Sequence, residues 1–141
     1  MIARKLASIA LFLTACSEQP PEPSCVTDVV ADCAPQYSPP TFAVVFEKIL
    51  RPTCASGKGT CHTADAAKGG LVFEEPDVAH DLLLGKRDGR ARVAAGDPAC
   101  SLLVKRLRAS DSRERMPPGP TGLTAGEICT VTRWIGEGAR R

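Results

Sequence analysis

Cys54 and the adjacent pair Cys61-His62 constrain the fold of this chain more than any other feature. Six residues separate the two cysteines, so the chain has to turn back within a short loop if both thiols serve one site. Gly57 and Gly59 lie inside that stretch, and glycine adopts the backbone conformations that tight loops require. The sequence therefore predicts a bulged loop that carries two thiols and an imidazole.

Residues 1–15 have the features of a signal peptide. Arg4 and Lys5 precede an apolar run at residues 6–15, which is too short to span a bilayer as a mature helix. The run ends in a lipobox-like Leu-Thr-Ala-Cys sequence, so Cys16 is predicted to become the lipidated N-terminus. We expect anchoring on the periplasmic side of the bacterial cell envelope, and Ser17 favours the outer membrane. An ordinary secretory signal that contains a cysteine is the alternative.

Residues 16–40 are predicted to form a proline-rich tether that follows the lipidated cysteine. Six of the chain's 12 prolines lie in this segment, and proline-rich linkers are extended and semi-rigid. We expect the folded domain to begin after the tether and to occupy residues 41–141.

The cysteine count favours disulfides in an exported protein. Once Cys16 is assigned to lipid, six of the seven cysteines remain, an even number typical of an oxidising compartment. Our preferred pairing joins Cys25 to Cys33 and Cys100 to Cys129. The remaining two, at positions 54 and 61, are expected to act together, either in chemistry or as an alternative disulfide.

The periodicity of the domain predicts a small all-α fold of about four helices. Thr41 is a candidate N-cap for a first apolar helical face that ends at Pro52. Asp97 is the expected cap of a later helix, and Thr124 with Glu127 forms a capping box. The expected helices after the first one cover residues 77–84, 97–108 and 124–138.

The charge balance argues against a nucleic-acid partner. Without Arg4 and Lys5, the 18 basic residues fall to 16, which equals the number of acidic residues. Nucleic-acid-binding proteins carry a strongly basic face instead. The sequence also lacks a Ser/His/Asp arrangement, a carboxylate pair and a phosphate-binding glycine loop. A hydrolase therefore has no support in the sequence. We also expect a monomer that is not an enzyme.

The residue types in the loop are those that hold a covalently attached haem. Two thiols form thioether bonds to such a haem, and the histidine after the second thiol binds the iron. The usual motif is C-x-x-C-H, so the spacing between Cys54 and Cys61 is wider than usual. Met116, followed by two prolines, is the candidate second axial ligand, because His/Met ligation suits electron transfer. The expected cofactor is haem c, with His62 and Met116 on the iron.

A series of short motifs runs through the domain in a fixed order. The motifs are Ile49-Leu50-Arg51-Pro52-Thr53-Cys54, Cys61-His62, Gly69-Gly70-Leu71, Val93 with Gly96-Asp97-Pro98, Ser101-x-Leu103, Met116-Pro117-Pro118, residues 123–128 and Trp134-Ile135-x-x-Gly138-Ala139. In this order they resemble a class I c-type cytochrome domain of the planctomycete type.

This resemblance implies a cytochrome c-like fold and one-electron transfer to a redox partner protein in the envelope. It also implies thioether bonds at Cys54 and Cys61, with His62 as the proximal and Met116 as the distal iron ligand.

Other functions remain open for the same loop. A disulfide between Cys54 and Cys61 would leave a haem-free, disulfide-stapled interaction module that keeps the cytochrome c fold. Cys61 alone could carry a single thioether. The two thiols, with His62 and His80, have the ligand types of a zinc site. A reversible dithiol that senses redox conditions is a further possibility.

His80 and two basic runs are less specific signals. His80 shares a helix face with apolar residues, so a partly buried structural role is favoured over a role as runner-up iron ligand. The basic runs at residues 86–92 and 105–115 are expected to be solvated faces, with docking of an acidic redox partner as the alternative.

Overall fold

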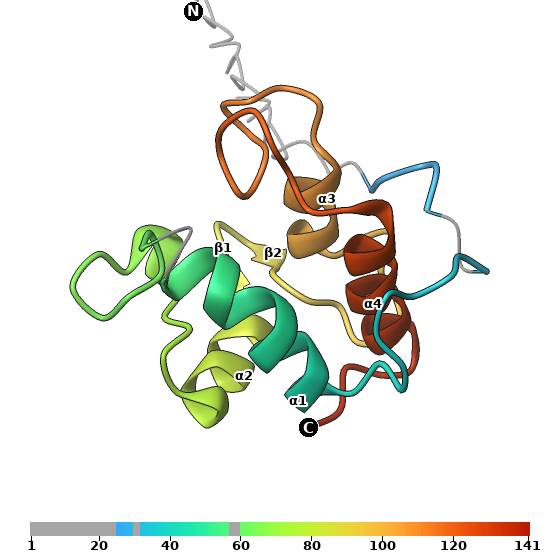
Figure 1. Cartoon of the computed structure of the whole chain (residues 1–141), viewed down its shortest axis with the longest axis horizontal. Helices are drawn as coiled ribbons and strands as arrows, with labels where there is room; N and C mark the ends of the chain where they lie inside the picture. The colour runs from blue at the N-terminus through green and yellow to red at the C-terminus, as the bar shows by residue number, and fades with distance from the viewer. Residues whose placement is uncertain (1–24, 30–31, 57–59) are drawn as a thin grey trace, which may run out of the picture.

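The computed structural model describes residues 25–29, 32–56 and 60–141. The predicted signal peptide, the lipobox with Cys16, Gly57 and Gly59 lie outside these residues. Within the described ranges, no helix is long and apolar enough to cross a bilayer. The helices gather around one core, with the first helix in the middle and α4 beside it (Figure 1).

The first helix has two parts, α1 (Phe42–Val45) and the π-helical segment η1 (Phe46–Ala55). The Thr41 side chain caps it by accepting a hydrogen bond from the Val44 amide at 3.4 Å, as the sequence predicts. One face of this long helix is buried throughout, at Phe42, Val45, Phe46, Ile49 and Leu50.

The predicted end of this helix at Pro52 is wrong, because η1 continues through Pro52 to Ala55. In an α-helix, proline lacks the N–H donor and its ring clashes with the carbonyl four residues earlier. The wider π turn moves the bonding partner to the fifth residue and so accommodates the ring. The additional turn places Cys54 at the last turn of the helix.

Three further α-helices are α2 (Pro76–Leu84), α3 (Leu102–Arg108) and α4 (Ala125–Gly136), and a 3-10 turn, η2 (Lys68–Gly70), precedes α2. The capping box that opens α4 is present as predicted. The Thr124 hydroxyl accepts from the Glu127 amide at 3.2 Å, and the Glu127 carboxylate accepts from the Thr124 amide at 2.8 Å.

Helix α3 begins at Leu102, not at Asp97 as the sequence predicts. Asp97 does act as a cap, but of a turn: its Oδ1 accepts a hydrogen bond from the Cys100 amide at 3.0 Å. The same residue pairs with Ala94 in an isolated bridge, and its carbonyl accepts a hydrogen bond from the Ser101 hydroxyl at 2.9 Å. These bonds hold residues 97–101 in a turn, so the helix starts after it.

A two-stranded antiparallel sheet, β1 (Lys86–Arg87) and β2 (Arg90–Ala91), follows α2. The fold is therefore mostly helical rather than purely all-α as predicted. Asp88 and Gly89 form the connecting turn with positive φ values of 51° and 77°. Paired positive φ angles define the turn type that Asp-Gly favours in two-residue hairpins.

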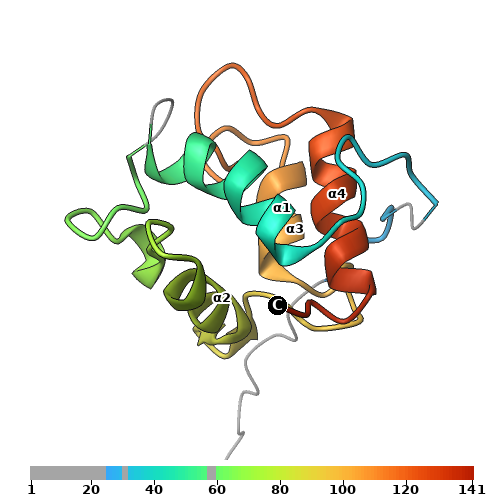
Figure 2. The same cartoon turned by 60° about the horizontal axis from the view of Figure 1, so that its bottom comes forward.

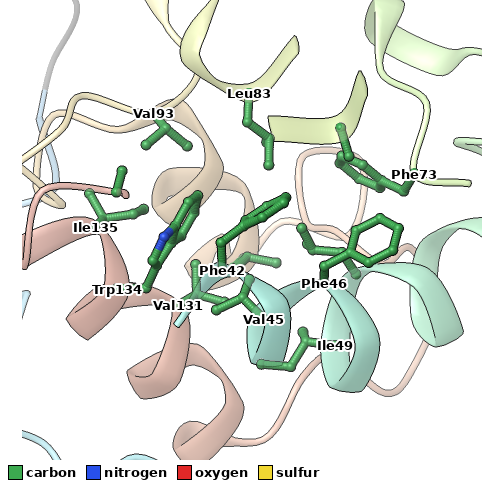
Figure 3. Packing of buried hydrophobic residues seen from close by; sticks show 14 of the residues in the cluster. Phe42, Val45, Phe46, Ile49, Phe73, Leu83, Val93, Val131, Trp134 and Ile135 are labelled. Carbon is green, nitrogen blue, oxygen red and sulfur yellow. The ribbon is translucent and has the colours of Figure 1, made fainter. Parts of the chain in front are cut away.

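The core lies between α1 with η1, α2 and α4. Phe42 stands in its centre, with its ring centroid 5.4 Å from that of Trp134 and 5.9 Å from that of Phe46 (Figure 3). Trp134 is 2% exposed, and its Nε1 donates to the Arg140 carbonyl at 2.8 Å. Helix α4 contacts both α1 and α3, so it connects the two sides of the domain (Figure 2).

Two disulfides fasten the proline-rich segment to the domain, and they are not the predicted ones. Cys25 is joined to Cys100 and Cys33 to Cys129, in place of the expected pairs Cys25–Cys33 and Cys100–Cys129. Because α3 starts after Cys100, that cysteine lies in a turn beside the N-terminal segment instead of on a helix face. The four predicted disulfide cysteines are therefore paired, but across the domain.

Backbone hydrogen bonds also attach the N-terminal segment to the domain, both between Cys25 and Cys33 and after Cys33. The Val26 amide donates to the Ala99 carbonyl and the Gln36 amide to the Gly126 carbonyl, both at 2.9 Å. The segment runs along the α3–α4 side of the molecule (Figure 1). Residues 25–40, which the sequence assigns to a tether, are thus part of the folded unit wherever the structure describes them.

Candidate functional site

The last turn of η1 and the following loop bring Cys54 next to His62. The Cys54 carbonyl accepts a hydrogen bond from the His62 amide at 3.0 Å, which closes the loop that contains residues 55–61. The chain thus turns back within the wide cysteine spacing, as the sequence predicts. The first of the two thiols lies on a helix end and the second immediately precedes the imidazole.

Backbone bonds on the other side of the loop fix Cys61 and His62. The Cys61 carbonyl accepts from the Lys68 amide at 2.9 Å, and the His62 carbonyl accepts from the Phe73 amide at 2.8 Å. The Phe73 ring is 2% exposed and lies against the imidazole, with the ring centroids 5.0 Å apart. The histidine is therefore held by the backbone on both sides and by an aromatic ring.

The electrostatics of His62 favour its neutral form. Its side chain is buried, and burial lowers the pKa because it disfavours the charged imidazolium, while the backbone at Leu71 and Lys68 acts in the opposite direction. Burial has the larger effect. The buried Nδ1 makes no well-formed hydrogen bond within the described residues. A neutral imidazole with an unsatisfied nitrogen is the form that binds a metal ion.

The two loop cysteines are thiols in the structure, in contrast to the other four described cysteines. The alternative disulfide between Cys54 and Cys61 is therefore not formed. Burial raises the pKa of Cys54 to about 12, and repulsion from a Cys61 thiolate adds to this shift. Cys54 packs against the core, and Cys61 is half-buried.

Met116 lies in a separate loop between α3 and α4. Its amide donates to the Arg106 carbonyl at 2.9 Å, which attaches the loop to α3, and its side chain packs against the core. The peptide bond to Pro117 is cis. The structure brings together the two thiols and His62, but it shows no bond from Met116 to any of them.

His80 is a structural histidine, as the sequence favours. Its Nε2 lies 2.9 Å from the Ala139 carbonyl oxygen, and its ring meets the Phe42 ring edge-on at 4.7 Å between centroids. This contact ties α2 to the C-terminal segment. The nitrogen that would bind iron is occupied, so the role of runner-up ligand is not supported.

The predicted zinc alternative is wrong. Among the described residues, no three histidine, cysteine, aspartate or glutamate side chains converge to hold a metal ion. Covalent haem attachment does not require such convergence, because the two sulfurs bond to the edge of the porphyrin and only the imidazole binds iron.

The sequence predicts only a solvated basic face for Arg92. In the structure Arg92 makes contacts with the chain that follows the candidate site. Its guanidinium donates to the Gly69 carbonyl at 2.9 Å and to the Leu82 carbonyl at 3.1 Å. It thus joins the chain that follows His62 to the end of α2. The Asp88-Gly89 turn is the signal that could have predicted the hairpin, which positions Arg92.

The comparisons with known proteins agree with this arrangement. Residues 59–120 match the family model described as planctomycete cytochrome C. These residues, less than half of the chain, are similar to a planctomycete-type cytochrome c-like domain. The matched residues include Cys61, His62 and Met116 but begin after Cys54. No curated protein and no solved structure matches the chain.

The donor set of this cytochrome c-like domain fits a covalently attached haem. Two free thiols, a buried neutral imidazole with an unsatisfied Nδ1 and a half-buried thioether are the groups such a cofactor uses. Cys54 and Cys61 would hold the porphyrin through thioether bonds, and His62 and Met116 would bind its iron.

Proposed function

We propose that the protein is a c-type cytochrome-like electron carrier whose haem is covalently bound through Cys54 and Cys61. When bound, haem supplies a one-electron couple whose potential depends on its axial ligands. The remaining properties of the site come from the chain itself.

The pattern of cysteine oxidation carries this proposal. Four of the six described cysteines are paired in disulfides, and the two left as thiols are those next to His62. In an oxidising compartment, free thiols in a small disulfide-bonded protein are exceptional unless a reaction uses them. Thioether formation consumes both thiols, which explains why they stay outside the disulfide framework.

The contacts around His62 suit the role of a fixed axial ligand. Backbone bonds to Cys54 and Phe73 hold the residue on both sides, and the Phe73 ring restricts the imidazole. Because burial lowers the pKa of His62, a proton competes weakly for the nitrogen that the metal needs. The histidine is thus organised before the cofactor arrives.

The cellular setting follows from the N-terminal residues. We propose that Cys16 is acylated after cleavage of residues 1–15 and holds the protein on the periplasmic side of an envelope membrane. A redox partner protein in the same compartment would deliver or accept the electron. The protein transfers electrons and does not catalyse a reaction of its own.

Visible spectra of the exported protein and its variants test the attachment. We expect a Soret band that survives denaturation and acid–acetone extraction in the wild type, and its loss in Cys61→Ala and His62→Ala. Met116→Leu should keep the haem attached but change the axial-ligand spectrum. A wild-type protein without any Soret band, produced alongside a working haem-attachment system, would contradict the proposal.

The second candidate is a haem-free interaction module with the same fold. It is favoured by the two disulfides, which stabilise the domain without a cofactor. This candidate predicts a folded exported protein without haem, in which Cys54 and Cys61 both react with a thiol reagent once the protein is unfolded, since Cys54 is buried in the folded state.

A further inference from the structure

A cavity of about 260 Å³ lies between the β1–β2 hairpin and the start of α3, away from the candidate haem site. Its walls come from the hairpin, the turn before α3 and the first turns of α3. The lining residues are Lys86, Gly89, Arg90, Ala91, Ala94, Ala99, Cys100, Ser101, Leu102 and Lys105.

The cavity wall is fixed by covalent and hydrogen bonds. Cys100 is tied to Cys25 by a disulfide. The Ser101 hydroxyl is buried, accepts from the Ala94 amide at 2.8 Å and donates to the Asp97 carbonyl at 2.9 Å. Such bonds preserve a hollow without a ligand, and preformed hollows are typical of small-molecule sites.

All charged side chains that line this cavity are basic. Lys86 and Arg90 of the hairpin and Lys105 of α3 supply three cations, and no carboxylate of the described residues lines the cavity. Lys86 and Arg90 form no ion pair with another described residue, whereas their neighbour Arg87 is paired with Asp88 at 3.3 Å. The cavity therefore combines a positive rim with aliphatic walls.

A second cavity of similar volume shows the contrast. It is lined by Lys105 and Arg108 but also by Asp28, Asp111 and Glu114. Its charges are mixed, and Asp28 neutralises Arg108 through an ion pair of 2.6 Å. Only the cavity beside the hairpin has a lining without acidic residues, of the two described.

We propose that the cavity between the hairpin and α3 binds a small organic anion, a carboxylate with a compact apolar body. The carboxylate would lie against Lys86 and Arg90, and the apolar body against the aliphatic wall at Leu102. The volume is near the lower end of small-molecule sites, which span about 300–1,000 Å³, so the ligand is compact. This proposal is independent of haem attachment.

Isothermal titration of the exported full-length protein with benzoate at low ionic strength tests the site. We expect saturable binding with one benzoate per chain. Arg90→Ala should weaken it about tenfold, because a half-buried guanidinium makes charge-assisted hydrogen bonds, and Lys86→Ala about threefold. Arg87→Ala is the matched control on the same hairpin and should leave the affinity unchanged, since Arg87 does not line the cavity.

Two further measurements separate the parts of the proposal. Ala91→Leu fills the cavity without removing a charge and should abolish binding while the thermal unfolding curve stays that of the wild type. Inorganic phosphate should bind much more weakly than benzoate. The proposal is overturned if benzoate does not bind, if Arg90→Ala and Lys86→Ala leave its affinity unchanged, or if phosphate binds equally well. Cys61→Ala should bind benzoate normally, so the outcome does not depend on the haem site.

Discussion

His62 is the residue on which the candidate site depends, and its position is determined by its neighbours in the chain. The Cys54 carbonyl and the Phe73 amide bond to its backbone, and the Phe73 ring packs on its imidazole. These contacts close the loop without help from a cofactor. Burial then lowers the pKa of the imidazole, so the neutral form dominates near neutral pH.

The lowered pKa of His62 predicts how the haem-free protein responds to acid. At pH values above the ordinary imidazole pKa of 6.5, His62 is neutral in both the folded and the unfolded state, so its protonation does not affect the free energy of unfolding. Below that pKa, the unfolded chain takes up a proton that the buried imidazole resists, so the free energy of unfolding falls as the pH drops towards the folded pKa.

Urea denaturation of the haem-free wild type and His62→Gln on both sides of pH 6.5 measures this effect. The wild type should lose stability on acidification more steeply than the variant. Equal losses in the two proteins would show that His62 does not resist protonation in the folded state.

At the scale of elements, the sequence predicts helix starts that depend on nearby residues better than helix ends that depend on packing. The caps at Thr41 and Thr124 form as the sequence predicts, because each depends on residues within one turn. The passage of η1 through Pro52 was not predictable from the usual behaviour of proline, because a π turn depends on the packing of the whole helix. The Asp88-Gly89 pair is a sequence signal for a hairpin turn. The prediction of a solvated basic run at residues 86–92 does not include this hairpin.

The capping box of α4 gives an element-scale prediction. Replacing Thr124 by alanine removes the hydroxyl that accepts from the Glu127 amide and donates to Gln36 at 2.7 Å. We expect the free energy of unfolding to fall by about 1 kcal/mol. Thr124→Ser should retain most of the stability, and Thr121→Ala, at an exposed position, should have no effect in the same urea titration. A loss in Thr121→Ala as large as in Thr124→Ala would contradict this role.

At the scale of the whole molecule, the two disulfides determine how the N-terminal segment joins the domain. They link positions 75 and 96 residues apart in sequence, so both close long loops. The even count predicts paired cysteines, and the position of Cys61 beside His62 sets Cys54 and Cys61 apart from the other four. The partners of those four could not be predicted, since they depend on the packing of the N-terminal segment against the turn before α3 and against α4. The return of the chain from Cys54 to His62 was predictable from the need to bring both thiols to one site, whereas the burial of the Cys54 thiol follows from core packing.

Removal of the longer disulfide should lower stability strongly. In the chain-entropy model, a loop of about 100 residues contributes roughly 4.7 kcal/mol, and measured losses are about 2–5 kcal/mol. We expect the double variant Cys33→Ala/Cys129→Ala to lose an amount in this range in urea denaturation. A stability equal to that of the wild type would mean that the segment is not held by this bond.

The most direct test of the central claim is peptide mapping by mass spectrometry of the exported protein after it has been unfolded and alkylated, so that the buried Cys54 is accessible. The account predicts a haem-bearing peptide in which the sulfurs of Cys54 and Cys61 are both thioethers and resist alkylation. Recovery of both cysteines as alkylated, haem-free residues, or joined to each other in a disulfide, would contradict it.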